Sequence, residues 1–168
     1  MPITIRETFD KIFKPPSNGG RQVIALSRAN AERLPAVDSA ALISITGPNR
    51  PPATLAPFNY LLRLTFADVD FDSVDLSSKA IEKLPYQFTE VQATQVLAFV
   101  EGLPAGIRSI VVHCEGGFSR SCAVAKALHA LYGYAVDDEQ LSEANPAVER
   151  VLRETAKRRA GVAKKRRK

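Results

Sequence analysis

Short apolar runs of strand length recur along the chain, separated by segments with helical or turn-like patterns. The runs cover residues 23–26, 41–45, 61–66 and 109–113, and each is continuous and partly β-branched. Strands covered on both faces of a parallel sheet have this uninterrupted pattern, whereas strands with one face in water alternate. The pattern therefore predicts a sheet buried between two other layers.

Helical signals lie between and after these runs. Thr89 and Gln92 form a capping box, and the apolar residues that follow recur at helical spacing. A second, alanine-rich helix is predicted from Arg120 to Tyr132, and a third begins with Asn145 as its N-cap. Strands that alternate with helices predict an α/β fold, with a mostly parallel central sheet of about four to five strands flanked by helices.

Length and composition are those of one ordinary globular domain. The chain has 168 residues, of which 45% are hydrophobic and 24% charged, and this suits a single core. No apolar segment has the length needed to cross a bilayer, and the short charged N-terminus does not resemble a signal peptide. Two cysteines are too few for the disulfide framework of a secreted protein, so we expect a cytoplasmic protein.

Turn residues and charge divide the chain into three parts. The breaker-rich segment 15–20 sets off an N-terminal extension, residues 1–21, from a domain at residues 22–156. Residues 157–168, predicted to be a disordered basic tail, hold 8 of the 23 Lys and Arg residues and no acid. The remainder has 15 basic and 18 acidic residues, so it is not a basic nucleic-acid platform. The tail could contact nucleic acid, an anionic membrane or an acidic protein, or it could be a solvated end.

The segment 113–121, with the sequence HCEGGFSRS, joins the last apolar run to the alanine-rich helix. Ligands of parallel sheets bind beyond the carboxyl ends of the strands, and N–H groups at a helix start attract anions. Two glycines allow this loop to curl until several amides point at one centre. The pattern predicts an oxyanion-binding loop whose amides belong to Glu115, Gly116, Gly117, Phe118, Ser119 and Arg120.

Cys114 begins this loop and Arg120 ends it. A helix N-terminus and a nearby arginine favour the thiolate form of a cysteine, which is the nucleophilic form. The guanidinium of Arg120 can offer two parallel N–H donors to a phosphate. Ser121 brings a hydroxyl near the sulfur, where it can stabilise the thiolate when phosphate leaves it.

His113-Cys114, five further residues and Arg120-Ser121 resemble the signature of the cysteine-dependent protein tyrosine phosphatases, most closely the dual-specificity branch. The order of strands and helices over residues 22–134 is also similar to that family. The resemblance implies that residues 22–156 form a phosphatase domain with Cys114 as nucleophile and His113 supporting the loop through a hydrogen bond. Gly116 stands where many members have alanine. The loop has no lysine, so an inositol-lipid substrate is less favoured.

The resemblance also implies an aspartate general acid on the loop after residues 61–66. In the family this acid falls two residues after the last apolar residue of the strand, which selects Asp68, with Asp70 and then Asp72 as alternatives. The other reading is that these aspartates, together with Asp75, only solvate a loop. The separation between Asp68 and Cys114 is longer than in compact relatives, which predicts an insertion at residues 70–86.

The function implied by the resemblance is hydrolysis of phosphomonoesters on proteins through a phosphocysteine intermediate, without a metal or cofactor. The expected substrate is phosphotyrosine, with phosphoserine and phosphothreonine as further candidates. The alternatives are an RNA 5′-phosphatase that uses the same loop, a catalytically inactive phosphate-binding module, and sulfur transfer or arsenate reduction. Cys122 is expected to be a buried helix residue, with a disulfide to Cys114 as the alternative.

Overall fold

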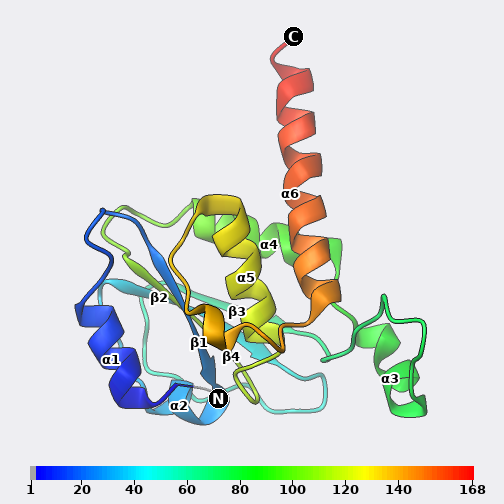
Figure 1. The fold of residues 1–168 in the computed structure, drawn as a ribbon, viewed down its shortest axis with the longest axis horizontal. Helices are drawn as coiled ribbons and strands as arrows, with labels where there is room; N and C mark the ends of the chain where they lie inside the picture. Colours follow the sequence, from blue (N-terminus) through cyan, green and yellow to red (C-terminus); the bar gives the residue numbers. More distant parts are fainter. Residues whose placement is uncertain (1–2) are drawn as a thin grey trace.

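The computed structural model, which describes residues 3–168, contains one four-stranded sheet (Figure 1). Its strands lie in the order β1-β4-β2-β3, and each of the three strand pairs is parallel. Each predicted apolar run forms one strand, so the predicted α/β fold with a parallel sheet is confirmed. The strands are β1 (Gln22–Ser27), β2 (Ala40–Thr46), β3 (Leu61–Thr65) and β4 (Ser109–Cys114).

Helices cover both faces of this sheet (Figure 1). Alternate residues of one strand enter different cores: Ile110 and Val112 pack with the larger cluster on the α4 and α5 side, and Val111 with the α1 and α2 side. This burial on both faces explains the apolar runs of β1, β2 and β4, whereas the edge strand β3 has only one buried residue and includes the exposed Arg63. The helices are α1 (Ile5–Phe13), α2 (Arg28–Arg33), α3 (Ser78–Lys83), α4 (Glu90–Glu101), α5 (Arg120–Tyr132) and α6 (Pro146–Arg166), with 3-10 turns at η1 (Leu84–Tyr86) and η2 (Asp138–Gln140).

The local signals for three helices are confirmed. The Thr89 hydroxyl and the Gln92 side chain form the predicted capping box at the start of α4. α5 spans the predicted residues and is followed by Gly133, whose φ of 69° is the left-handed conformation that favours glycine. Asn145 caps α6, where its side chain accepts hydrogen bonds from two backbone N–H groups.

The N-terminal segment belongs to the same core as the predicted domain. Ile12 of α1 is 2% exposed and packs, together with Ile3, against Ile24 and Leu42 of the sheet. The Arg108 guanidinium also donates to the carbonyl oxygens of the breaker-rich segment at Pro16 and Gly20. The boundary predicted at residue 22 therefore does not separate two structural units.

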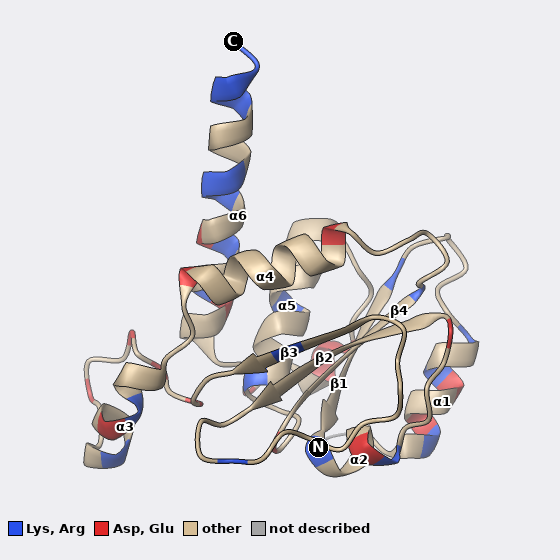
Figure 2. Cartoon of the chain, turned by 180° about the vertical axis from the view of Figure 1, so that it is seen from behind, with Lys and Arg blue, Asp and Glu red and all other residues tan. Residues whose placement is uncertain are grey.

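The C-terminal basic segment is helical, which corrects the prediction of a disordered tail. α6 continues to Arg166 and extends from the body of the molecule (Figures 1 and 2). Lys, Arg and Ala are good helix formers, and adding residues to an anchored helix avoids the cost of nucleation. Ion pairs from Arg158 to Glu90 and from Arg159 to Glu101 hold the first turn of the segment against α4.

The segment between β3 and α4 forms a small lobe beside the main layers (Figure 1). It contains α3 and η1, neither of which has a buried residue, and it occupies the positions at which an insertion was predicted. Among the helices described for residues 3–168, none is both long and apolar enough to span a bilayer.

Candidate active site

Cys114 ends β4 at the carboxyl edge of the sheet, and its side chain is 2% exposed. The backbone N–H of Gly117 donates to its Sγ atom at 3.3 Å, and the Ser121 Oγ atom lies 3.2 Å from the same sulfur. Both contacts can stabilise negative charge on the sulfur. The loop therefore curls back over the cysteine, and the predicted Ser121 contact is present.

A side chain at the two loop glycines, Gly116 and Gly117, would meet different obstacles. Gly117 has a φ of 81°, and a Cβ atom there would overlap the backbone of Leu26 and Ser27 at the end of β1. Only glycine combines this conformation with so close a backbone approach. At Gly116 the space that a Cβ atom would take is filled by the Phe118 ring, which is 44% exposed. Because this ring is exposed and can turn aside, a Cβ atom at Gly116 is excluded less strictly than one at Gly117.

Arg120 begins α5 and is 5% exposed. Its Nη1 atom donates to the Phe66 carbonyl oxygen at 2.9 Å, which directs the guanidinium toward the end of β3. Its buried Nε has no hydrogen-bond partner among the described residues. A buried donor without an acceptor costs roughly 1–3 kcal/mol, so this atom is available to an anion that could accept from it.

His113 is fully buried, and its Nε2 atom lies 2.6 Å from the Ser44 Oγ atom on the neighbouring strand β2. Its Nδ1 atom faces the Cys114 carbonyl oxygen at 3.4 Å. A carbonyl can only accept, so the geometry assigns the proton to Nδ1 and makes Nε2 the acceptor of the Ser44 hydroxyl. Burial lowers the pKa of His113 to about 4. His113 is therefore neutral at pH 7 and supports the loop by hydrogen bonding.

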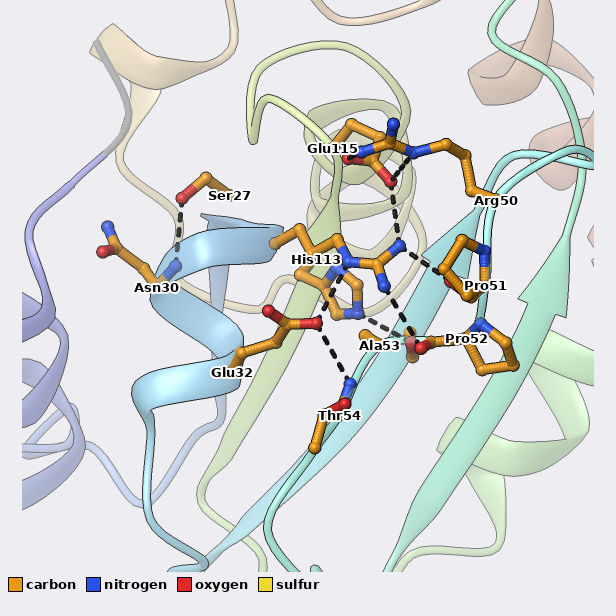
Figure 3. Close-up of polar contacts among 12 residues, drawn as sticks. Ser27, Asn30, Glu32, Arg50, Pro51, Pro52, Ala53, Thr54, His113 and Glu115 are labelled. Carbon is orange, nitrogen blue, oxygen red and sulfur yellow. Dashed lines mark hydrogen bonds and ion pairs between the residues drawn. The ribbon is translucent and has the colours of Figure 1, made fainter.

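The side chain of Glu115 connects the loop to the segment after β2 (Figure 3). Arg28 and Arg50 each form an ion pair with this carboxylate, at 3.1 Å and 3.2 Å. Burial opposes its ionisation, but the hydrogen bonds from Arg50 and Arg28 prevail and hold the pKa of Glu115 below its ordinary value. The sequence motif indicated only a backbone role for Glu115, because Arg28 and Arg50 are distant from it in the chain.

Asp68 and Arg120 line the same cavity, which has a volume of about 470 Å³. The cavity opens between the loop after β2, the end of β3 and the α3 lobe. Asp68 is the only one of the four candidate aspartates among its lining residues. The lining consists of Gly47, Pro48, Asn49, Arg50, Ala67, Asp68, Lys79, Glu82, Lys83, Tyr86, Glu115 and Arg120.

The other three aspartates have contacts outside this cavity. Asp70 accepts a hydrogen bond from the backbone N–H of Asp72, within a turn. The Asp72 carboxylate binds Arg150 on α6, with one contact of 2.8 Å between Oδ1 and Nη2. Asp75 is exposed and lies in the next bend. Of the alternatives that the sequence left open, the structure therefore places Asp68 beside Arg120, and Asp70 and Asp72 elsewhere.

Several residues of the site had no signal in the sequence motif. Arg50, Lys79 and Lys83 bring cationic side chains to the cavity, and Tyr86 brings an aromatic ring. The lysines come from the α3 lobe, whose packing depends on tertiary contacts. Asn145 was predicted as a helix cap, but its hydrogen bond to Asp68 could not be read from spacing.

Cys122 is a buried residue of α5, as expected. Its thiol faces the carbonyl oxygens of Gln140 at 3.1 Å and Gly117 at 3.5 Å. Burial, and then the nearby Cys114, raise the pKa of Cys122 to about 12. Both cysteines are free thiols in this structure. The buried, protonated Cys122 is a packing residue of α5.

The fold is similar to that of PTPMT1. The crystal structure of PTPMT1 in complex with PI(5)P aligns with a TM-score of 0.50 and 16% identity, over 84% of this chain and 94% of that chain. A second crystal structure of PTPMT1 aligns with a TM-score of 0.48 and 18% identity, over 86% of this chain and 95% of that chain. No family profile and no curated protein sequence matches the chain. The comparison therefore establishes a shared fold.

Proposed function

We propose that this chain is a cysteine-based phosphatase that hydrolyses phosphomonoesters on proteins, with phosphotyrosine as its first substrate and phosphoserine or phosphothreonine as further ones. The observation that carries the proposal is the buried Arg120 guanidinium, whose Nε donor lacks a partner beside the loop of Cys114. A phosphate oxygen is the acceptor that a planar, two-donor group of this kind binds best.

In the first step the Cys114 thiolate attacks phosphorus. The S–P bond forms as the bond from phosphorus to the leaving oxygen breaks, and Asp68 gives its proton to that oxygen. Arg120 and the loop amides bind the other phosphate oxygens, on which charge is concentrated in the transition state. The position of Asp68 and Arg120 on one cavity supports these roles.

In the second step water attacks the phosphocysteine. Asp68, now ionised, accepts a proton from the water, and the S–P bond breaks to release phosphate and the thiolate. The Ser121 hydroxyl, 3.2 Å from the sulfur, can donate to the departing thiolate. The neutral His113 keeps its contacts to Ser44 and the Cys114 carbonyl throughout.

The size and charge of the cavity support a protein substrate. About 470 Å³ is room for an aromatic phosphoester and neighbouring groups, and Tyr86 and Pro48 provide apolar surface. Lys79 and Lys83 would favour a phosphorylated segment that carries acidic residues, whereas Arg50 is already paired with Glu115. We therefore propose an acidic phosphotyrosine segment as the substrate class.

The basic part of α6 gives little support to the RNA 5′-phosphatase alternative. The 21 residues of α6 begin at Pro146, directly after the cap Asn145 beside the site, and at 1.5 Å per residue the basic end lies roughly 30 Å along the helix. We propose that this end contacts a polyanion or an acidic protein at a distance from the reacting phosphate.

A steady-state comparison of four substrates tests the proposed function: a phosphotyrosine peptide, a phosphothreonine peptide, triphosphate-ended RNA and PI(5)P, which PTPMT1 binds in its crystal structure. We expect the highest kcat/KM for the phosphotyrosine peptide, loss of all turnover in Cys114→Ser, and retention of peptide binding in that variant. A labelled phosphocysteine should be trapped by rapid acid quenching. Preference for RNA or PI(5)P would replace the proposed substrate, and turnover that survives in Cys114→Ser would overturn the mechanism.

A further inference from the structure

Both hydrogen bonds to the Asp68 carboxyl reach the same oxygen. The Ser119 Oγ atom lies 2.8 Å from Asp68 Oδ1, and the Asn145 Nδ2 atom lies 3.0 Å from it. Among the hydrogen bonds of residues 3–168, none involves Asp68 Oδ2. The two carboxyl oxygens are therefore in different environments, although the group itself is symmetric.

The orientation of the Asn145 amide is determined by its other contacts. Its Oδ1 atom accepts from the backbone N–H groups of Ala147 and Val148 at 3.1 Å and 3.3 Å. Its Nδ2 atom also donates to the Val69 carbonyl oxygen at 3.1 Å. A flipped amide would place the NH2 group against two N–H donors and lose every one of these bonds. The group that faces Asp68 is therefore the NH2 group.

Asn145 is also held rigidly between the catalytic segments. It is 5% exposed, and its backbone N–H donates to the Ser119 carbonyl oxygen at 3.2 Å. One residue thus connects the Asp68 segment, the loop that carries Cys114 and Arg120, and the start of α6. Buried polar groups with all their partners in place are rigid and fix their neighbours.

We propose that Asn145 is a positioning residue that, with Ser119, places the acidic proton of Asp68 on Oδ2. The proposal rests on the proposed function. An amide NH2 group can donate but cannot accept, so a proton on Oδ1 would face a donor at 3.0 Å. The Ser119 hydroxyl could turn and accept a hydrogen bond from such a proton, whereas the Asn145 NH2 group could not. Asn145 therefore determines which oxygen of Asp68 carries the proton. Asp68 then presents its proton on the oxygen free to meet the leaving group.

The same contacts serve the second step. Once Asp68 has lost its proton, both donors bind an ionised carboxylate, and such charge-assisted hydrogen bonds are stronger than neutral ones. Asn145 and Ser119 therefore hold the carboxylate in place while Oδ2 accepts the proton of the attacking water. No rotation of the carboxyl group is required between the two steps.

The test compares Asn145→Ser with wild type on leaving groups of different acidity. Serine keeps a capping oxygen for α6 but lacks the NH2 donor. We expect kcat to fall about 10- to 100-fold on a phosphotyrosine peptide and less than about threefold on 4-nitrophenyl phosphate, whose leaving group needs little protonation. KM should stay unchanged, and the Brønsted dependence on leaving-group acidity should steepen. In the Asp68→Asn background, Asn145→Ser should cause no further loss.

Two more variants separate positioning from stability. Thr4→Ala removes the N-cap of α1, which packs on the opposite face of the sheet from α4 and α5, and should lower the melting temperature without any leaving-group dependence. Ser119→Ala should show a smaller leaving-group-dependent loss than Asn145→Ser. An equal loss on both substrates in Asn145→Ser, or an additive loss with Asp68→Asn, would overturn the positioning role. The proposed function fails separately, if wild type lacks turnover or Cys114→Ser keeps it.

Discussion

Arg120 is held in place by one hydrogen bond while another of its donors is left free. Lysine would supply a charge, but it could not bind the Phe66 carbonyl and present two planar donors together. We expect Arg120→Lys to lower kcat/KM for an aryl phosphate about 10²–10³-fold. Arg108→Lys is the control, because Arg108 contacts only the carbonyls of Pro16 and Gly20. Wild-type kinetics in Arg120→Lys would exclude a phosphate cradle built on this residue.

Removal of the Asp68 carboxyl should lower kcat by a factor that depends on the leaving group. We expect Asp68→Asn to lower kcat on a phosphotyrosine peptide about 10²–10⁴-fold and to affect 4-nitrophenyl phosphate far less. Steady-state kinetics on the two substrates measures the difference. Asp72→Asn is the matched control, since Asp72 binds Arg150 outside the cavity. If Asp72→Asn showed the leaving-group effect instead, Asp72 and not Asp68 would be the general acid.

His113 should make the fold less stable in acid. Burial lowers its pKa to about 4 in the folded state, whereas the ordinary pKa is about 6.5. Between these pH values the unfolded chain binds a proton that the folded chain does not, so stability is lost as pH falls from 6.5 toward 4. The loss amounts to about 3 kcal/mol.

Urea denaturation at pH 7 and pH 4.5 measures this effect. His113→Asn removes the titrating ring, so its free energy of unfolding should decrease less on acidification than that of wild type. The variant should be the less stable protein at pH 7, and the difference should narrow at pH 4.5. An identical pH dependence in both proteins would mean that the imidazole does not have the assigned protonation state.

At the scale of elements, the α3 lobe matters because it is bound to the site although its helices α3 and η1 bury no residue. Lys83 reaches the Asp68 carbonyl oxygen at 3.3 Å, and the Ala67 N–H donates to the Tyr86 carbonyl at 2.8 Å. These contacts place the lobe over the cavity, while helix α3 itself buries no residue. Elements with so little burial unfold locally at low cost, so substrate contacts can be changed here without loss of the fold.

The lobe lysines should act on substrate selection and leave the chemistry unchanged. We expect the double variant Lys79→Ala/Lys83→Ala to lower kcat/KM for an acidic phosphotyrosine peptide about fivefold to tenfold at low salt, and less at high salt. Turnover of 4-nitrophenyl phosphate should remain unchanged. Lys164→Ala/Lys165→Ala changes the charge equally at the far end of α6 and is the control. Equal effects of both double variants would mean that the net charge of the protein, and not a local contact of Lys79 and Lys83 with the peptide, determines kcat/KM.

At the scale of the whole molecule, the candidate active site and the basic residues lie at opposite ends of α6. The first residues of the helix cap and pack beside the site, where Val148 and Leu152 are fully buried. The last turns carry Lys and Arg without acidic residues and lie in solvent (Figure 2). The basic end is therefore available to a partner while the active-site face stays open.

Removal of residues 160–168 tests this separation and preserves the ion pairs of Arg158 and Arg159. We expect the rate on a small aryl phosphate to stay within about twofold of wild type, because the deleted turns make no contact with the site. Binding to RNA, heparin or anionic vesicles should weaken, and its salt dependence should decrease. Loss of aryl phosphatase activity in this truncation would show that the basic end supports the catalytic core.

The sequence by itself determined the four strands, the helices α4, α5 and the start of α6, and the loop that runs from Cys114 to Arg120. Apolar runs predicted all four strands because burial on both faces leaves few polar positions in β1, β2 and β4, and β3 keeps enough apolar residues to be recognised. Caps at Thr89 and Asn145 act within one turn. The spacing of Cys114 and Arg120 is likewise a property of one short loop. Such local patterns are written in neighbouring residues, so they can be read without the fold.

Tertiary structure decided everything that depends on residues distant in the chain. It placed Asp68, and not Asp72, at the cavity, because Asp72 meets Arg150 of α6. It also joined Asn145 to Asp68 across 77 positions of sequence, and it extended α6 through the basic segment along α4. No spacing rule reaches so far, since each of these contacts depends on how helices pack around the sheet.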